Sequence, residues 1–569
     1  MNYLKNFLNI IILLILIVNS SFASEFSHHL SILSNPKYNK DFKNFDYVDP
    51  NARKGGHVKF GVQGNFNSLN QFILKGISAS GLSYLYDSLA VSSEDEISTQ
   101  YGLVAKSIRL AKNKMSIEFK LRKEAKFHDN KPITVDDIIH SFNLISKYGH
   151  PSYQMILKNV KKVIKINNYH VKYIFNNNNR DLPKVISSLP ILAKHFYNED
   201  NFTKANLNIP LGSGPYKITK VDPNKSITYQ RVKDYWAKDL PVNKGRYNFN
   251  KITFDYYRDN NILVEAFKAQ KYDVRLENIA RNWANSYNIE AIKNNEIIKQ
   301  EITHNIASPM QAFIINLRKD KFSNIALRKA LNLAFNFNWL KKHIFYNSYI
   351  RTNSFFPNSN YSYYNNIANN AFDHRKNIIF AQKILEDAGY KIIDNNLIDQ
   401  VSNKNIEIEF LTLSESFTMV IAPYIKHLKM LGINAKIRMV EENQYKTRVN
   451  NFDYDIITSS FYQAKIPGSE LYSYFHSTQK NIKGSRNLIG IEDKQIDNII
   501  EKIISAKNID IISKYCKKLD KILIDNHYVI PQWYNNKFRL LTRNIFIIPK
   551  IRPKYSLSVD SWYIKDKFL

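Results

Sequence analysis

Alternating apolar and polar residues predict a set of strands in the first half of the chain. The alternation at 57–62 predicts one strand, and the same pattern at 216–221, 227–232 and 252–257 predicts three more. The first strand is separated from the others by a long stretch of chain. We therefore expect a sheet assembled from segments that are distant in sequence.

The second half of the chain shows strands and helices in alternation. Residues 406–413 alternate as a strand, 417–431 have helical spacing that ends at Gly432, and strands are predicted again at 435–440 and 454–458. Such a β-α-β-α-β succession places neighbouring strands parallel in one sheet. This half is therefore predicted to form a separate α/β domain.

Two other segments complete the predicted elements. A helix is expected at 135–145, because Thr134 and Asp137 have the spacing of a capping box. Near the end of the chain, 529–534 and 538–542 read as short strands with no core of their own. We expect both of these strands to complete the sheet of the first domain.

The first residues predict export. Residues 1–5 carry one lysine and no acid, 8–18 are apolar apart from one asparagine, and Ser21-Phe22-Ala23 offers a cleavage site. We interpret 1–23 as a secretory signal peptide, with a soluble mature chain that begins near Ser24 in a periplasm-like space. The apolar stretch is shorter than the ~20 residues of a membrane-spanning helix, and no nearby cysteine could carry a lipid.

Composition narrows the class of protein. With 569 residues, 44% hydrophobic and 23% charged, the chain has the make-up of a folded protein of three or four domains at about 150 residues each. Its single cysteine, Cys516, excludes a disulfide framework and any multi-cysteine metal site. We expect this thiol to be a buried apolar filler.

The formal net charge of +31 could indicate a nucleic-acid partner. The basic residues, however, are spread along the chain and mixed with asparagine and isoleucine, and arginines do not cluster with aromatic residues. This pattern indicates a general compositional bias. A basic nucleic-acid-binding protein is therefore the less favoured alternative.

Motifs for catalysis are nearly absent. The sequence has no HExxH, G-x-S-x-G, P-loop or G-x-G-x-x-G motif. Two S-x-x-K matches, Ser34 with Lys37 and Ser477 with Lys480, keep open an exported serine hydrolase of cell-wall peptides, although chance explains them better. The adjacent His28-His29 pair is expected to point to opposite sides of a mobile N-terminus, so we predict neither a metal site nor a cofactor.

Several segments together resemble one family. SLN at 68–70, YDSL at 86–89, FHDNKPITVDD at 127–137 and GSGPY at 212–216 resemble, in order and spacing, the family 5 extracellular solute-binding proteins, which are the peptide receptors of ABC importers. Further segments resemble the YejA-type branch, associated with peptides and with the peptide antibiotic microcin C. These segments are HLS at 29–31, residues 42–48, MQAF at 310–313, FYNSYIRTNSFF at 345–356 and GSRNLIG at 484–490.

The resemblance implies the fold and the domain boundaries. It implies an α/β, two-lobed periplasmic binding protein fold of the large three-domain class, with a hinge near Ser308-Pro309 and 528–533 that closes on a ligand. The first lobe would combine a discontinuous domain with an inserted one, and the second lobe would be continuous. The implied ranges are 24–80, 206–308 and 530–569 for the discontinuous domain, 81–205 for the inserted domain and 309–529 for the second lobe.

The resemblance also implies ligand-binding residues. A receptor that accepts many side chains holds a peptide by its main chain, through addition of a β-strand, with hydrated side-chain pockets. The implied residues are a first-lobe segment, residues at the end of one second-lobe strand, a glycine-serine turn and aromatic residues near the crossings. They are Lys75, Gly76, Ile77 and Ser78; Tyr462 and Gln463; Arg486 and Asn487; and Phe313, Trp533 and Tyr534.

One departure from the family pattern concerns the peptide N-terminus. Oligopeptide receptors place an aspartate soon after this second-lobe strand to pair with the α-ammonium group, but here Glu470 is the sole acid in the stretch 462–470. The expected ligand is therefore a peptide whose amine is blocked or held elsewhere, such as a formylated peptide antibiotic or a murein peptide. Arg486 and the net charge favour a ligand with carboxylates. A monomer that delivers its ligand to a membrane ABC permease is the implied mode of action.

Overall fold

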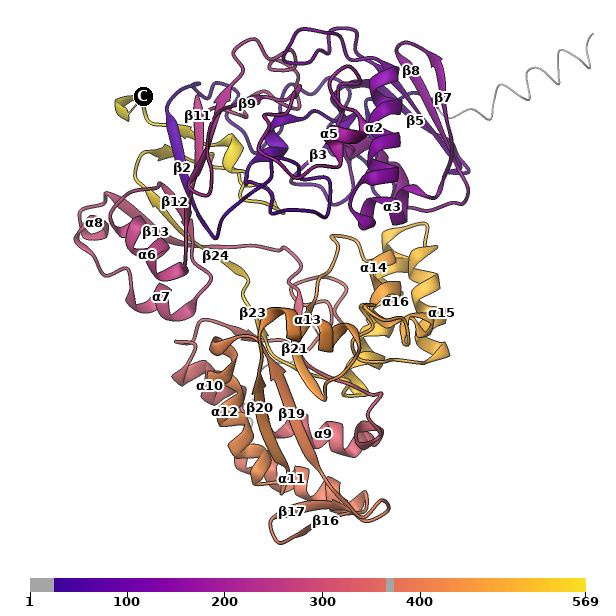
Figure 1. Cartoon of the computed structure of the whole chain (residues 1–569), viewed down its shortest axis with the longest axis vertical. Coiled ribbons are helices and arrows are strands. Elements are labelled where there is room, and N and C mark those ends of the chain that lie inside the picture. Colours follow the sequence, from indigo (N-terminus) through magenta and orange to yellow (C-terminus); the bar gives the residue numbers. More distant parts are fainter. Residues whose placement is uncertain (1–24, 365–372, 569) are drawn as a thin grey trace, which may run out of the picture. The chain divides into compact units, whose positions relative to one another are not determined.

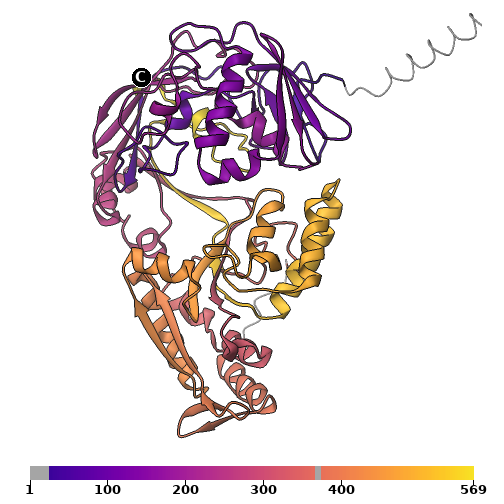
Figure 2. The same cartoon turned by 45° about the vertical axis from the view of Figure 1, so that its right-hand side comes forward.

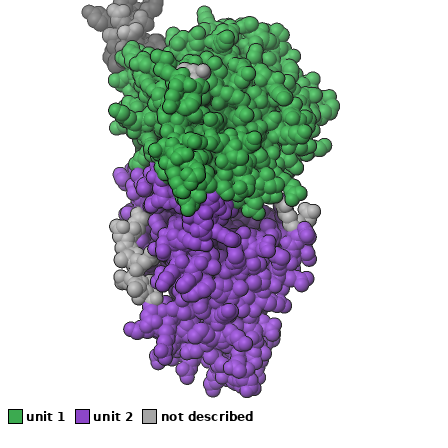
Figure 3. All heavy atoms as spheres, turned by 90° about the vertical axis from the view of Figure 1, so that its left-hand side faces the viewer, with its two compact units in different colours: residues 1–276, 288–300, 540–569 green, residues 277–287, 301–539 purple. Residues whose placement is uncertain are grey.

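The computed structural model describes residues 25–364 and 373–568, and the predicted signal peptide at 1–23 lies outside them. The chain forms two compact units, coloured separately in Figure 3. Unit 1 comprises the chain up to Leu276, Asn288–Gln300 and Leu540–Leu569; unit 2 comprises Glu277–Tyr287 and Glu301–Arg539. In the described part of the chain, no helix is both long and apolar enough to cross a membrane.

Unit 1 is built on a sheet whose strands come from distant segments, as predicted. β2 pairs in parallel with both β11 and β12, and β24 from the end of the chain pairs with β12. The boundary between the two units falls inside β13 and β24. In order across the sheet, the strands are β13 (Ile297–Thr303), β24 (Lys537–Arg543), β12 (Val274–Leu276), β2 (His57–Gln63), β11 (Lys251–Tyr257), β10 (Ser226–Arg231) and β9 (Tyr216–Asp222).

A second core of unit 1 is formed mainly by residues 81–205, with Leu30 and Phe72 joining it. The helix α2 (Val135–Tyr148) begins with the predicted capping box between Thr134 and Asp137. Its apolar face joins Ile117, Phe119 and other buried side chains of an antiparallel sheet in one cluster. Figure 1 shows the helix beside this sheet. The strands of this sheet, in order, are β5 (Ala105–Leu110), β6 (Ser116–Leu121), β8 (His170–Phe175) and β7 (Val160–Asn167).

Unit 2 contains the predicted β-α-β-α-β succession. β19 pairs in parallel with β20 and with β21, and Gly432 ends the intervening helix with a positive φ of 72°. The elements are β19 (Glu407–Thr412), α12 (Glu415–Lys429), β20 (Asn434–Met439), α13 (Glu442–Asn450) and β21 (Ile456–Phe461). Two antiparallel strands, β14 (Met310–Ile315) and β22 (Val529–Pro531), extend the sheet to the order β20-β19-β21-β14-β22.

The main core of unit 2 lies between this sheet and three helices. Side chains of α9 (Ile325–Ala334), α11 (His374–Asp387) and α12 pack with Phe313, Phe410 and Ile456 of the strands. Three further helices, α14 (Ser469–Phe475), α15 (Lys494–Ile504) and α16 (Ile509–Asp525), pack together beside the sheet, as Figures 1 and 2 show. Cys516 of α16 is fully buried, as expected.

The segment 529–534 does not join the sheet of the first domain, and our expectation for it was wrong. β22 pairs with β14, and the short strand β23 (Trp533–Tyr534) pairs with β15 (Ile350–Arg351). The nearby β24 does join the sheet of unit 1, as predicted. A short alternating segment carries no information about its partner, because any open strand edge offers the same hydrogen bonds.

The buried carboxylate of Asp520 on α16 fixes the segment that follows β15. It accepts hydrogen bonds from the Ser354 hydroxyl (2.8 Å), the Phe355 N–H (2.6 Å) and the Tyr363 N–H (2.8 Å). Burial disfavours the ionised form and raises the pKa of Asp520 to about 6, although these three hydrogen bonds oppose the shift. The contribution of this group to folding therefore depends on pH.

We predict that the stabilising effect of Asp520 is greater in mild acid than in mild alkali. The pKa is raised in the folded state, so folding binds a proton, and this stability is lost as the pH rises through about 6. The unfolding free energy of the wild type minus that of Asp520→Asn should be larger at pH 5 than at pH 8, by about 1 kcal/mol. Urea titrations at both pH values measure it; an equal difference at the two pH values would contradict the assignment.

Candidate ligand-binding site

The pairing of β14 with its two neighbouring strands brings most of the predicted second-lobe residues to one end of the sheet of unit 2. β14 runs antiparallel to both β21 and β22, with Met310 opposite Phe461 and Ala312 opposite Pro531. The end of β21, the start of β14 and the end of β22 therefore lie at the same end of the sheet. Tyr462 and Gln463 follow β21 there, and Trp533 and Tyr534 follow β22.

Tyr462 and Arg486 are joined through an aromatic side chain that the sequence did not single out. The Tyr474 hydroxyl on α14 donates to the carbonyl oxygen of Tyr462 (3.2 Å), and the Arg486 guanidinium lies 5.1 Å from the centre of the Tyr474 ring. Tyr462 is 63% exposed and Arg486 is also exposed. Among the described residues no carboxylate pairs with Arg486. The cluster therefore presents a cation without a carboxylate partner beside the ring of Tyr474.

The other residues at this end of the sheet differ in how many of their hydrogen-bonding groups are used and in how much of their surface is covered. The Gln463 amide donates to the carbonyl oxygen of Phe355 (2.8 Å), while its own carbonyl oxygen is buried without a hydrogen-bond partner. Trp533 packs against Phe345, with ring centres 4.3 Å apart, and is partly buried. Tyr534 is half-buried, which raises the pKa of its hydroxyl. Gln463 thus keeps an acceptor, and the two aromatic residues keep part of their surface.

Two predicted site residues have structural positions instead. Phe313 is fully buried and stacks on Tyr424, with ring centres 5.8 Å apart, because its side chain points into the core between sheet and helices. Asn487 is also fully buried: its amide donates to the carbonyls of His476 (3.3 Å) and Ile491 (3.0 Å), and its oxygen accepts the N–H groups of Gly490 and Ile491. Neither side chain is accessible to a ligand.

In unit 1, the predicted segment 75–78 forms an exposed loop. The Ile77 carbonyl accepts the N–H groups of Asn67 (3.0 Å) and Ser68 (3.1 Å), and Ser78 forms a parallel bridge with Ser68. Gly76 has a positive φ of 85°, which L side chains rarely adopt. In a parallel bridge of this kind, the N–H and C=O of Ser78 itself point away from the partner, so they are the groups that could pair with an added strand.

The Lys residues of both S-x-x-K matches are bound to carboxylates. Lys37 contacts Asp46 (2.8 Å) and Asp95; burial opposes its charged form, but these hydrogen bonds outweigh it and raise the pKa of the ammonium group. Lys480 pairs with Glu492 (2.7 Å). A lysine that takes a proton from serine must be a neutral amine, so this environment is unsuited to a general base.

The expectation for His28 and His29 was wrong in its geometry. The two rings are in edge contact, with centres 4.8 Å apart, and the chain is held here because β1 (His29–Leu30) pairs with β4 (Gln100–Gly102). His28 Nε2 donates to the carbonyl of Tyr38 (3.1 Å). Within 25–364 and 373–568, no group of three or more His, Cys, Asp or Glu residues could hold a metal ion.

Comparison with known proteins identifies the family. Residues 99–482 match the model of the bacterial extracellular solute-binding proteins, family 5. A probable peptide-binding protein, YejA, of Agrobacterium fabrum is 33% identical over 94% of this chain and 93% of that protein. A peptidoglycan-binding protein, YepA, of the same organism is 31% identical over 89% of this chain and 90% of its own length.

The fold agrees with this result. The oligopeptide-binding protein AppA of Bacillus subtilis, solved in complex with a nonapeptide, matches with a TM-score of 0.67 at 20% identity, over 90% of this chain and all of that one. The chain therefore belongs to the family 5 solute-binding proteins and has the α/β periplasmic binding protein fold. Its relatives are binding proteins rather than enzymes.

Truncation to alanine should change the unfolding free energy strongly at Asn487 and very little at its neighbour Arg486. We predict that Asn487→Ala lowers the unfolding free energy by about 2 to 3 kcal/mol, because four backbone groups each lose a hydrogen bond and the N–H and C=O of Ile491 are left buried without one. Arg486→Ala should change it by less than about 0.5 kcal/mol, as for other exposed positions. Chemical denaturation of both variants tests this contrast, and equal losses would show that Arg486 has a structural role instead.

Proposed function

We propose that this protein is a periplasmic receptor that captures peptides and delivers them to an ABC-type membrane permease. The observation that carries the proposal is the similarity, over 94% of the chain, to a protein described as probably peptide-binding. The neighbouring structures solved with peptides, such as AppA with its nonapeptide, support it as well.

The exposed groups of both units suit a peptide held by its main chain. The free N–H and C=O of Ser78 offer strand addition in unit 1. In unit 2, the partly exposed Gln463 belongs to the proposed surface, although its carbonyl oxygen is buried without a partner. The guanidinium of Arg486 is free to bind a carboxylate through two parallel hydrogen bonds. Lys75, Gly76 and Ile77 complete the surface proposed for unit 1, and Trp533 and Tyr534 complete the one proposed for unit 2.

The N-terminus of the peptide is not held by an aspartate in this proposal. Glu470 accepts the N–H of Gly468 (3.1 Å) at the start of α14, so its carboxylate is already engaged. A peptide with a blocked amine, or a peptide of cell-wall origin, needs no such anchor. The name of the relative YepA, a peptidoglycan-binding protein, supports the murein alternative.

The remaining parts of the proposal concern location and assembly. A signal peptide at 1–23 would export the chain, and the mature protein would act as a monomer without cofactor or catalysis. The alternative of an exported serine hydrolase has little support, since both candidate lysines are bound to carboxylates.

Native mass spectrometry of the purified mature protein tests the proposed ligand. We expect a bound species with a discrete peptide mass, released intact on denaturation and with no new fragments after long incubation. Binding tightens on closure of a hinged receptor, so a fraction of the ligand should survive purification. Cleavage of an added peptide, abolished by Ser477→Ala or Ser34→Ala, would support the hydrolase; steep salt-dependent retention on DNA would support the nucleic-acid alternative.

Arg486 offers the sharpest test of the proposed surface. We predict that Arg486→Ala weakens binding of an acidic peptide by about 1.5 to 3 kcal/mol, the scale of a charge-assisted hydrogen bond. Arg486→Lys should restore part of the affinity, because an ammonium cannot form the planar two-bond contact. Arg438 is exposed on β20, so Arg438→Ala is the matched control for loss of one positive charge. Calorimetry that finds equal affinities for Arg486→Ala and Arg438→Ala would refute the assignment.

A further inference from the structure

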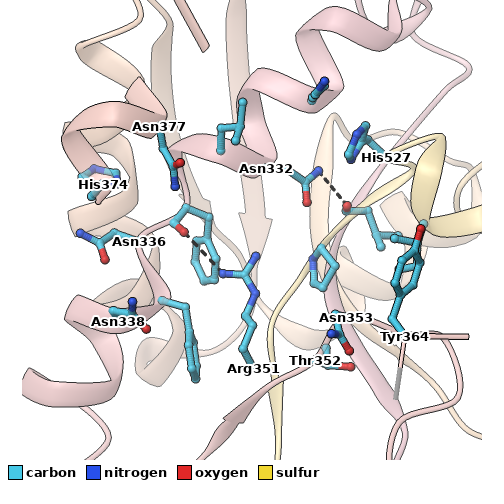
Figure 4. Close-up of a pocket in the computed structure, with 17 residues that line it drawn as sticks. Asn332, Asn336, Asn338, Arg351, Thr352, Asn353, Tyr364, His374, Asn377 and His527 are labelled. Atoms are coloured by element: carbon cyan, nitrogen blue, oxygen red, sulfur yellow. Dashed lines mark hydrogen bonds between the residues drawn. The ribbon is translucent and has the colours of Figure 1, made fainter. Parts of the chain in front are cut away.

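A separate cavity of about 350 Å³ lies within unit 2, against the edge strand β22 (Figure 4). Its walls are formed by the end of α9, α10 (Phe337–His343), residues 351–353 at the end of β15, the first turn of α11 and the end of α16. It shares no residue with the surface proposed for peptides. This volume is in the range of sites that hold small molecules.

The guanidinium of Arg351 lines this cavity without an acidic partner. It donates one long hydrogen bond to the carbonyl of Phe335 (3.4 Å), the C-cap of α9, and lies 4.8 Å and 5.8 Å from the ring centres of Phe335 and Phe337. Among the described residues no carboxylate pairs with it, and residues 365–372 contain no Asp or Glu. Burial lowers its pKa to about 10, so the group remains charged at neutral pH.

Arg351 is partly buried, and the contacts that hold its guanidinium leave several of its N–H donors without a protein partner. A helix C-terminus and aromatic rings both favour a cation. A guanidinium has five N–H donors, however, and a single hydrogen bond is formed here. The side chain therefore retains donors that a planar anion could accept.

The remaining wall of the cavity is cationic or neutral. Lys329, His374 and His527 line it, and none of the described lining residues is an Asp or Glu. The carboxylate of Asp525, beside His527 in sequence, is engaged by the Tyr364 hydroxyl (2.6 Å) and by Lys521. An anion that entered would thus meet no fixed negative charge in the cavity wall.

The chemistry of the walls selects the kind of anion. Asparagine amides, among them Asn332 and Asn377, add neutral hydrogen-bonding groups around Arg351, and Asn332 also donates to the carbonyl of Val529 (3.0 Å). Leu333, Phe337 and Ile524 supply apolar surface. One guanidinium among amides matches a single planar carboxylate, and the apolar walls match a hydrocarbon body.

We propose that this cavity is a second ligand site, which binds a small organic carboxylate with an apolar body. Arg351 binds the carboxylate group, and the side chains of Leu333, Phe337 and Ile524 cover the apolar part. The site uses different residues of unit 2 from the proposed peptide surface, although Arg351 pairs with Trp533 across β15 and β23.

Calorimetry with 3-phenylpropanoate on the mature chain tests this proposal. The carboxylate should bind, while the neutral analogue 3-phenylpropan-1-ol and inorganic phosphate should bind at least about tenfold more weakly, since one lacks the charge and the other the apolar body. Arg351→Gln should reduce affinity for 3-phenylpropanoate by about 10- to 100-fold, the scale of a charge-assisted contact. Arg438→Gln and Arg486→Ala should leave that affinity unchanged.

A second variant keeps the test decisive if Arg351→Gln fails to fold. Asn377→Trp leaves Arg351 in place but fills the cavity from α11, so it should also abolish binding. The proposal would be overturned if 3-phenylpropanoate does not bind, or if the alcohol or phosphate binds equally well. Wild-type affinity in Asn377→Trp would also overturn it. Loss of binding in Arg486→Ala would do so as well, by assigning the carboxylate to the peptide surface. If 3-phenylpropanoate binds as expected but the protein binds no peptide, the proposed function alone would be refuted.

Discussion

The antiparallel pairing of β14 with strands from two distant parts of the chain is the constraint on which the arrangement of unit 2 depends. Its register sets Met310 opposite Phe461 and Ala312 opposite Pro531. Buried backbone N–H and C=O groups must be paired, so a shift in this register would cost several hydrogen bonds at once. The residues after β21 and β22 are consequently held at one edge of the sheet, and Tyr462 and Trp533 with them.

Arginine side chains in unit 2 show how surroundings decide what a guanidinium does. Arg328 is buried and donates to three backbone carbonyls, those of Phe322, Ser323 and Asn526, so its donors are used within the fold. Arg486 is exposed over an aromatic ring, and Arg351 faces a cavity with one long hydrogen bond. The same chemical group thus acts as a structural brace in one place and remains available to an anion in the other two.

Buried carboxylates have a structural role in this protein, because they hold irregular segments in place. Asp520 binds the chain after β15, and in unit 1 Asp87 accepts hydrogen bonds from Tyr235 (2.7 Å) and Trp236 (2.8 Å). Burial raises the pKa of Asp87 to about 7, against these hydrogen bonds. These two acids are therefore committed to holding the fold rather than to binding a ligand.

The sequence by itself determined the strands and helices with strong periodicity, the capping box at Thr134 and, through its motifs, the family. Such features depend on residues close together in the chain, and periodicity reports directly which face of an element is buried. Tertiary structure decided the rest. β22 joined β14 rather than the sheet of unit 1, because strand pairing is available at any open edge. Phe313 and Asn487 became structural, and Arg351 came to line a cavity, because burial and the absence of a partner depend on side chains that folding brings together from distant segments.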